Sequence, residues 1–213
     1  MTCRTPEFMV DLVIRALQHS GARAIIQSGW AHLSMETLKA ATADETLLEY
    51  AAENVMFMEA SPHEWLFPQC ACIVHHGGAG TTACAARAGV PMIITPIFLD
   101  QFDHAYVVNE LGIGVGFEKQ FQGVHAVELG EAVKRCVSDA AIVERAKEVG
   151  ARMRAENAIP AVLEAIGDFW SASVESGSLQ RSIDEQIQAN RMRNATSLWH
   201  RVGTLCSSAC GNA

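Results

Sequence analysis

The sequence predicts an α/β fold built on a doubly wound parallel sheet. Two observations lead to this prediction. Short apolar runs such as "ACIVHH" and "PMIITP" recur along the first 170 residues, and they lack the alternating pattern of a strand exposed on one face. Between them lie longer segments with helical spacing of apolar residues. Apolar strands that alternate with helices are typical of a parallel sheet covered on both faces.

The first helix has clear signals at both ends. Thr5, Pro6 and Glu7 supply a capping hydroxyl, a first-turn proline and an acid near the positive end of the helix dipole. Apolar residues then recur at helical spacing, and Gly21 follows as a stop signal. We therefore expect a helix from the Thr5 cap to Gly21.

The remaining elements follow from the same patterns. We expect strands at 22–28, 54–59, 71–76, 91–96 and 114–118, and helices at 81–88, 101–112, 126–138, 140–155 and 158–170. A looser helical or loop stretch covers 33–52, and residues 62–67 form a loop that enters a short helical turn. These elements together predict one domain over residues 1–170.

The composition changes after Ser171. Residues 171–213 are rich in Ser, Gln, Asn and Arg and carry only isolated large apolar residues. We expect a polar, flexible tail with one helix near 179–193.

Bulk composition excludes several function classes. The chain of 213 residues has a formal net charge of −8 and no Lys/Arg cluster, which argues against nucleic-acid binding. No apolar stretch is long enough to span a membrane, and the first residues contain no signal-peptide core. The seven cysteines fit no zinc spacing, so we expect reduced thiols in a cytoplasmic protein.

Polar or unusual residues follow four of the expected strands, at 28–30, 62–63, 75–82 and 100–101. Ligands bind beyond the carboxyl ends of the strands in an open parallel sheet, so these segments should meet in one crevice. Gly77, Gly78 and Gly80 permit close approach of the backbone to a ligand there.

The same segment is rich in hydrogen-bond donors. The helix that begins near Thr81 offers unpaired N–H groups, and His75 or His76 can donate from an imidazole. These donors suit an anion that binds without a metal ion. They extend over enough residues to fit a diphosphate. The glycines alone fit a tight capped turn equally well, but the paired histidines favour binding.

Other motifs favour structural interpretations. No Walker lysine follows the glycines, and "GIGVG" at 112–116 lacks the strand–turn–helix context of a dinucleotide site. Adjacent histidines in a strand point to opposite faces, so we expect no metal site. We interpret Trp65 as a core residue and His104 as a helix-surface residue.

The segment "PHEWLFPQCACIVHHGGAGTTACAARAGVPMIITPIFLDQFDHAYVVNELGIGVG" resembles the donor-binding signature of UDP-sugar glycosyltransferases. It is most similar to sterol 3-β-glucosyltransferases and bacterial antibiotic and macrolide glycosyltransferases, and the likeness covers about residues 1–170. The resemblance implies the C-terminal, Rossmann-like half of a GT-B fold. It also implies an inverting transfer of a sugar, with glucose expected, from UDP-sugar as substrate, with no cofactor or metal.

The resemblance assigns roles residue by residue. It places His75 at the diphosphate, Gly77, Gly78, Ala79, Gly80 and Thr81 in the surrounding loop and helix start, Asp100 and Gln101 at the sugar hydroxyls, Pro62 and His63 at the uracil, and Trp30 near the nucleotide. Plant relatives have tryptophan and glutamate near Ala60 and Ala83, so the base and ribose contacts stay open.

Family members reach Gly-Ser-Met at the end of their first strand, and Met1 corresponds to that methionine. The resemblance therefore implies that this chain lacks a central strand of the sheet, the acceptor domain and the catalytic base, and contains no catalytic residue. A sterol or other lipophilic alcohol would bind to the missing N-terminal domain, with peripheral membrane contact in the full enzyme. Two alternatives remain open, namely a non-catalytic UDP-sugar-binding or accessory subunit, and a truncated, inactive fragment.

Overall fold

The computed structural model describes residues 4–209, with side chains except those of Trp30 and 194–209. Met1, which the resemblance matches to the methionine of the Gly-Ser-Met turn, lies outside the described residues. The chain forms two compact units, Met1–Glu156 and Asn157–Ala213. In the described part of the chain, no helix has the length and apolar character needed to cross a membrane.

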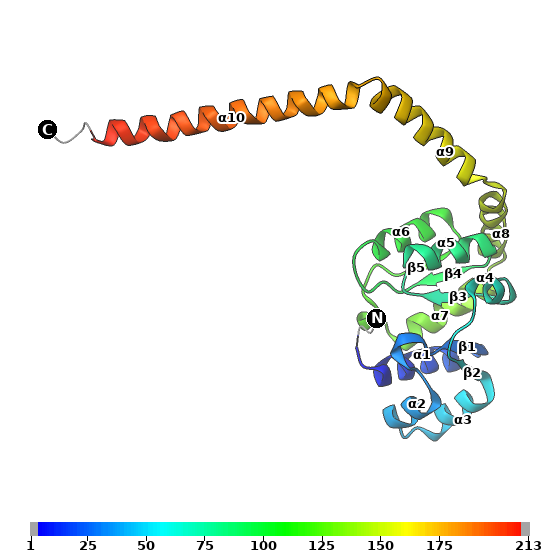
Figure 1. The fold of residues 1–213 in the computed structure, drawn as a ribbon. Helices are drawn as coiled ribbons and strands as arrows, with labels where there is room; N and C mark the ends of the chain where they lie inside the picture. The colour runs from blue at the N-terminus through cyan, green and yellow to red at the C-terminus, as the bar shows by residue number, and fades with distance from the viewer. Residues whose placement is uncertain (1–3, 210–213) are drawn as a thin grey trace. The chain divides into compact units, whose positions relative to one another are not determined.

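The first unit alternates strands with helices, as expected (Figure 1). Its elements are α1 (Pro6–Ser20), β1 (Ala24–Gln27), η1 (Gly29–Ala31), α2 (Met35–Ala41), α3 (Glu45–Asn54), β2 (Val55–Met58), α4 (His63–Leu66), η2 (Phe67–Gln69), β3 (Ile73–His75), α5 (Ala79–Ala88), β4 (Met92–Ile94), α6 (Gln101–Leu111), β5 (Gly114–Gly116), η3 (Phe121–Gly123), α7 (Ala126–Ser138) and α8 (Ala140–Ala155).

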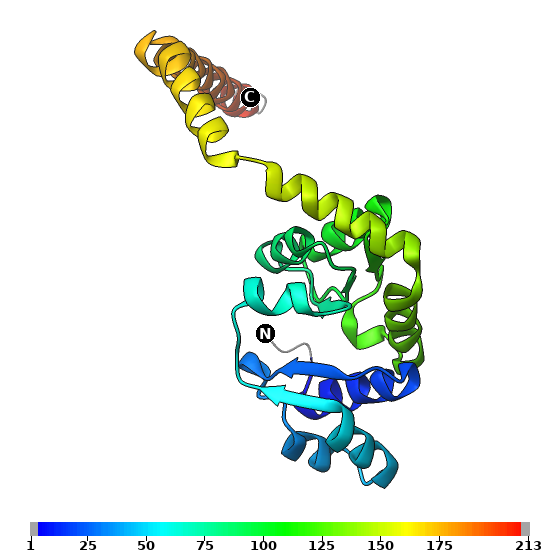
Figure 2. The ribbon, with the colours of Figure 1, turned by 90° about the vertical axis from the view of Figure 1, so that its right-hand side faces the viewer.

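All strand pairs are parallel, which confirms the predicted sheet type. The strands form two sheets, one of order β1-β2 and one of order β3-β4-β5. Ala24 pairs with Val55 in the first sheet, and Ile73 pairs with Met92 in the second. The two sheets lie apart from each other in both ribbon views (Figures 1 and 2). The central strand that the resemblance places between them stays a prediction.

Helix α1 joins the two sheets through apolar packing. Its start is capped as predicted, because the Thr5 hydroxyl accepts from the Phe8 N–H at 3.3 Å, and Gly21 ends it with a left-handed conformation, φ 69°. Leu12 packs into a core with α7 and the β3–β5 sheet, whereas Ile14 packs into a core with β1, α2 and α3. Each sheet therefore rests partly on this one helix.

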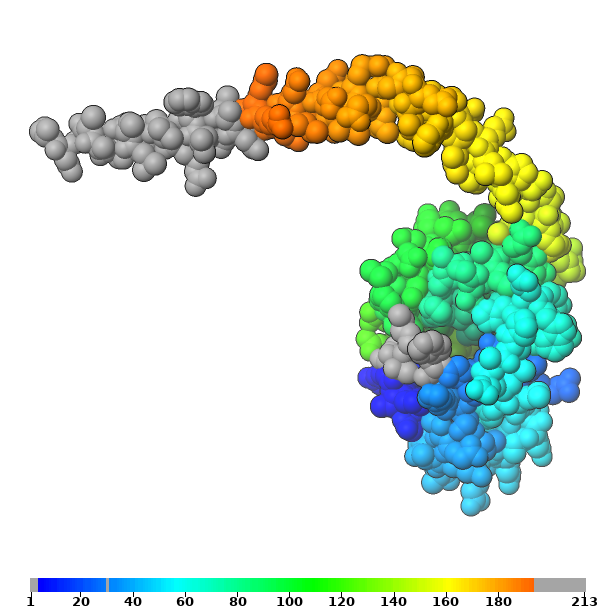
Figure 3. Space-filling model, in the orientation of Figure 1, coloured from blue at the N-terminus to red at the C-terminus, as the bar shows by residue number. Residues whose placement is uncertain are grey.

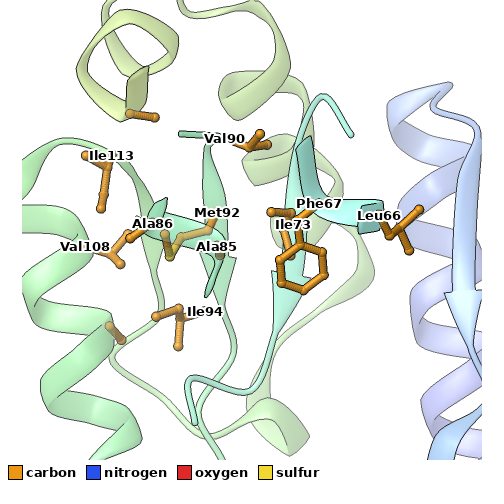
Figure 4. Packing of buried hydrophobic residues seen from close by; sticks show 12 residues of the cluster. Leu66, Phe67, Ile73, Ala85, Ala86, Val90, Met92, Ile94, Val108 and Ile113 are labelled. Atoms are coloured by element: carbon orange, nitrogen blue, oxygen red, sulfur yellow. The ribbon is translucent and has the colours of Figure 1, made fainter. Parts of the chain in front are cut away.

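A third core lies under the β3–β5 sheet. Met92 and Ile94 are fully buried against β3, α5 and α6, and Ile73 and Val108 contribute to the same cluster (Figure 4). Apolar residues also follow one another without polar interruption in β4, because this strand lies between two others and is buried on both faces. The space-filling view shows the halves around β1–β2, in blue and cyan, and around β3–β5, in green, as adjoining regions of the surface (Figure 3).

The structure refines one expectation from the sequence and contradicts another. The segment 33–52 contains two defined helices, α2 and α3, whose starts are capped by the Ser34 and Asp44 side chains. The prediction that Trp65 belongs to the core is wrong, because this residue is 60% exposed. Leu66 and Phe67, the next residues of the same turn, fill the core instead.

The described part of the second unit consists of helical segments joined by short turns. Helix α9 (Ala158–Phe169), a π-helical segment η4 (Trp170–Glu175) and α10 (Ser178–Ala209) follow one another. Helix α10 is longer than the helix predicted at 179–193. The predicted flexibility of this segment stays a prediction.

Candidate functional site

The loop from β3 to α5 holds the residues with the strongest sequence signal. Gly77 has φ +92°, a conformation that favours glycine, and a Cβ added to it would lie 2.7 Å from Ile94 Cγ2. Its N–H donates to His75 Nδ1 at 3.0 Å, and its carbonyl lies 2.6 Å from His104 Nδ1. The backbone at Gly77 is thus held on both sides by imidazoles.

These contacts define the protonation of His75. Its Nδ1 accepts from Gly77 and therefore carries no proton, so the proton of the neutral ring lies on Nε2. Burial, together with smaller effects of the charges of His76, His63 and His104, lowers the pKa of His75 to about 4, so the ring is neutral at pH 7. The Nε2 atom is buried and has no hydrogen-bond partner among the described residues. His75 therefore holds an unused donor.

Helix α5 starts directly after this loop. Thr82 is the first residue whose N–H bonds within the helix, to the Gly78 carbonyl at 2.9 Å. The N–H groups of Ala79, Gly80 and Thr81 precede it and have no acceptor within the helix. The Thr82 hydroxyl also turns back to the Gly78 carbonyl, at 3.0 Å. The helix start thus combines unpaired donors with the positive end of its dipole.

The β4–α6 connection lies against the same loop. Gln101 is buried. Its backbone lies so close to Gly77 that a Cβ added to this glycine would be 3.2 Å from the Gln101 carbonyl oxygen. Its side-chain oxygen accepts from the N–H groups of Ile97 and Phe98 at 2.8 and 3.2 Å, so this oxygen is already used within the protein. Asp100 is exposed at the start of α6, and its side chain makes no capping bond there. Asp100 therefore remains available to solvent.

A polar network lies at the ends of β1 and β2. Gln27 donates to the Ser61 hydroxyl at 2.8 Å and lies 3.3 Å from His63 Nε2. The His63 ring stacks on Phe67 with centroids 4.5 Å apart. Pro62 is exposed and precedes the short helix that carries His63. The network fixes His63 within electrostatic range of His75.

The structure thus brings most of the predicted site residues together. His75 and Gln101 both lie against Gly77 of the β3–α5 loop, and His63, after β2, is close enough to His75 to affect its pKa. For Trp30, only the backbone in η1 is described, so its predicted role lies outside the described side chains.

Two contributors were missed from the sequence. Gln27 occupies a strand position with no motif around it, and His104 was expected on the helix surface. His104 lies three residues after Gln101, and that helical spacing was the signal that could have placed both side chains on one face of α6.

The described residues contain neither a metal-binding cluster nor a predicted site residue in their best-formed hollow. Within them, no group of three or more His, Cys, Asp or Glu side chains is arranged to hold a metal ion. A hollow of about 320 Å³ lies between α1 and α7 and is lined by residues including Phe8, Leu12 and Val124. None of the predicted site residues lines this hollow. The candidate site lies at the strand ends, where His75 and the start of α5 offer hydrogen-bond donors without a partner among the described residues.

Residues 31–168 match the family model described as erythromycin biosynthesis protein CIII-like, C-terminal domain. The chain belongs to this family. The EryCIII-like match includes the loop after β3, the helix start of α5 and the β4–α6 connection. The fold is that of the C-terminal domain of a GT-B glycosyltransferase, as the resemblance implied.

Named relatives of the EryCIII-like chain agree with this assignment. A sterol 3-beta-glucosyltransferase of Komagataella phaffii is 32% identical over 199 residues, which make up 92% of this chain and 15% of that protein. The crystal structure of the glycotransferase of kitacinnamycin has 25% identity and a TM-score of 0.56, covering 73% of this chain and 37% of that one. The glycosyltransferase VinC in complex with dTDP shares the fold, with 24% identity, a TM-score of 0.54, and coverage of 68% and 33%. The chain thus spans less than a fifth of the length of this curated relative.

Proposed function

We propose that this chain is the donor-binding part of an inverting, metal-independent UDP-glycosyltransferase. It would hold a UDP-sugar, with glucose as the expected sugar, for transfer to a hydroxyl of a sterol or other lipophilic alcohol. The acceptor site and the general base would come from sequence outside the chain described here. Relatives named sterol 3-beta-glucosyltransferase and a fold neighbour that binds dTDP support this proposal.

The single observation that carries the proposal is the unused donor of His75. A buried polar group without a partner costs about 1–3 kcal/mol, so the protein benefits when an acceptor reaches it. The segment from β3 to α5 thus carries this Nε2–H and, a few residues on, a helix start whose N–H groups at Ala79 and Gly80 have no acceptor within the helix. A diphosphate provides several acceptor oxygens and negative charge, which suit both features.

In the complete enzyme, a base would remove the proton from the acceptor hydroxyl, and that oxygen would attack the anomeric carbon from the side opposite UDP. The bond between the anomeric carbon and the phosphate oxygen would break, and its electrons would stay on UDP. His75 Nε2–H and the N–H groups of α5 would stabilise this developing charge without a metal. Asp100, exposed beside the loop, is the residue that we assign to the sugar hydroxyls, with the side-chain N–H₂ group of Gln101.

Calorimetric titration of the chain with UDP, with and without magnesium, tests this proposal. We expect binding that does not require magnesium, weaker binding of UMP, and a loss of at least about tenfold in affinity in His75→Ala. His19→Ala is the matched control, because His19 is a partly exposed histidine paired with Glu131 at 2.6 Å on another part of the unit. A folded sample that releases no heat with UDP would contradict the proposal.

A further inference from the structure

The peptide group between Gly77 and Gly78 lies at the centre of the candidate site. Its carbonyl is 2.6 Å from His104 Nδ1. A carbonyl oxygen can only accept, so His104 Nδ1 carries the proton and donates it. His104 is half-buried on α6, and its own N–H bonds to the Asp100 carbonyl at 3.0 Å within the helix. The donor is therefore attached to a regular element, not to a loop.

This bond sets the direction of a second group. All described peptide bonds are trans, and in a trans peptide the C=O and N–H point in opposite directions. Since the Gly77 carbonyl is directed at His104, the N–H of Gly78 is directed away from His104. Gly78 is the residue directly before α5, so its N–H adds one more donor next to those of the helix start.

The opposite orientation of this peptide would be unfavourable for an anion. Both residues that flank the peptide are glycines, and glycine adopts positive and negative φ at similar cost, so rotation of the peptide has no side-chain barrier. Rotation by about half a turn would exchange the Gly78 N–H for the Gly77 carbonyl, whose partial negative charge repels a phosphate oxygen. The loop therefore needs a contact that selects one orientation.

We propose that His104 is a positioning residue that holds the Gly77 carbonyl against α6 and so keeps the Gly78 N–H available to the diphosphate of the donor. This inference rests on the proposed function and gives a defined role to His104, which the sequence placed on the helix surface. His104 touches the backbone of the loop and acts on the donor only through it.

The test compares two substitutions in the complete chain. His104→Leu removes the donor, and we expect UDP affinity to fall by about tenfold or more. His104→Asn restores an N–H donor at a similar distance from the helix, and we expect affinity within about threefold of the wild type. His19→Leu serves as the control for loss of a partly exposed histidine. If His104→Leu does not fold, His104→Ala replaces it.

A spectroscopic measurement separates positioning from a general structural effect. The ¹³C shift of the Gly77 carbonyl and the ¹⁵N shift of the Gly78 amide report the peptide orientation in the protein without UDP. We expect both to move in His104→Leu and to return in His104→Asn.

Two results would overturn the inference, and they are distinguishable. If the wild type binds UDP and His104→Leu binds it equally well with unchanged shifts, the inference alone is wrong. If the folded wild type does not bind UDP, the proposed function fails as well.

Discussion

At the scale of single residues, the hydrogen bonds of His75 and His104 to Gly77 determine which donors of the loop stay free for a ligand. His75 uses Nδ1 as an acceptor for Gly77, which leaves Nε2–H as a donor, and His104 uses Nδ1 as a donor to the same residue. Two histidines thus hold one glycine with opposite hydrogen-bond roles. A neutral His75 is required for this arrangement, because the protonated ring has no acceptor nitrogen.

The stability of the chain should therefore depend on pH through His75. The folded-state pKa of about 4 is below the ordinary value of 6.5, so the unfolded state binds more protons between these values. Neutral His75 therefore contributes fully to the free energy of unfolding above pH 6.5. This contribution is lost as the pH falls toward 4, and the total loss is about 3 kcal/mol. In denaturant titrations, we expect the wild type to lose this amount relative to His75→Gln over that range. A difference between the two proteins that is independent of pH would contradict this assignment.

Sequence patterns identified the loop of the site but not all of its partners. Gly77, Gly78 and His75 were recognised because paired histidines precede a glycine-rich turn at the end of an expected strand. The roles of Gln27 and His104 depend on contacts across 36 and 27 positions of the chain, which no local pattern reports. Trp65 was misplaced because an aromatic residue beside apolar neighbours looks the same in sequence whether it faces inward or outward.

At the scale of elements, "GIGVG" shows why a glycine pattern is not by itself a nucleotide site. Gly112 ends α6 with φ +66°, and Gly114 and Gly116 lie in β5. A Cβ on Gly114 would lie 1.8 Å from the Met92 carbonyl oxygen of β4, and one on Gly116 would lie 1.9 Å from that of Ala105. The glycines let strand and helix backbones approach closely, as the structural interpretation predicted.

Substitution at β5 should consequently be severe. The Cβ of Gly116→Ala would meet the backbone of α6, which cannot move aside as a flexible side chain can. We expect a loss of at least about 3 kcal/mol in the free energy of unfolding, measured by urea denaturation. Gly123→Ala is the matched control, since its Cβ would have only Lys119 Cδ within 4 Å, at 3.9 Å, and we expect a change within about 0.5 kcal/mol. Equal effects of the two substitutions would contradict this account.

Most element boundaries could be predicted because the end signals are local. The cap at Thr5 and the left-handed glycines at Gly21 and Gly112 lie where the sequence places them. Helices α2 and α3 were not resolved from the sequence, because their short apolar stripes give a weak periodic signal. The division of the strands into two sheets depends on long-range pairing, which periodicity does not report.

At the scale of the whole molecule, the two units differ in how their apolar residues are placed. The buried residues of the three cores all lie between Val10 and Ala146, within the first unit. In the second unit, large apolar residues such as Ile159, Leu163 and Trp170 are 73%, 63% and 54% exposed. The first unit therefore contains the interactions expected to support independent folding.

Removal of the second unit tests this division. We expect a chain of residues 1–156 to melt cooperatively, with a midpoint within about 3 °C of the full chain, because no core residue is removed. Calorimetry and circular dichroism measure this midpoint. Loss of the cooperative transition would show that residues 157–213 contribute to the fold of the first unit.

Helix α1 has a consequence for how the first unit comes apart. Leu12 and Ala16 belong to one core and Val10, Ile14 and Leu17 to another, so two apolar clusters share a single helix. Neither cluster can be opened to water by moving α1 without exposing the other. Although the described strands of the two sheets are not paired with each other, the halves should lose their structure in one concerted step, and amide protons on both sides should become accessible to solvent together.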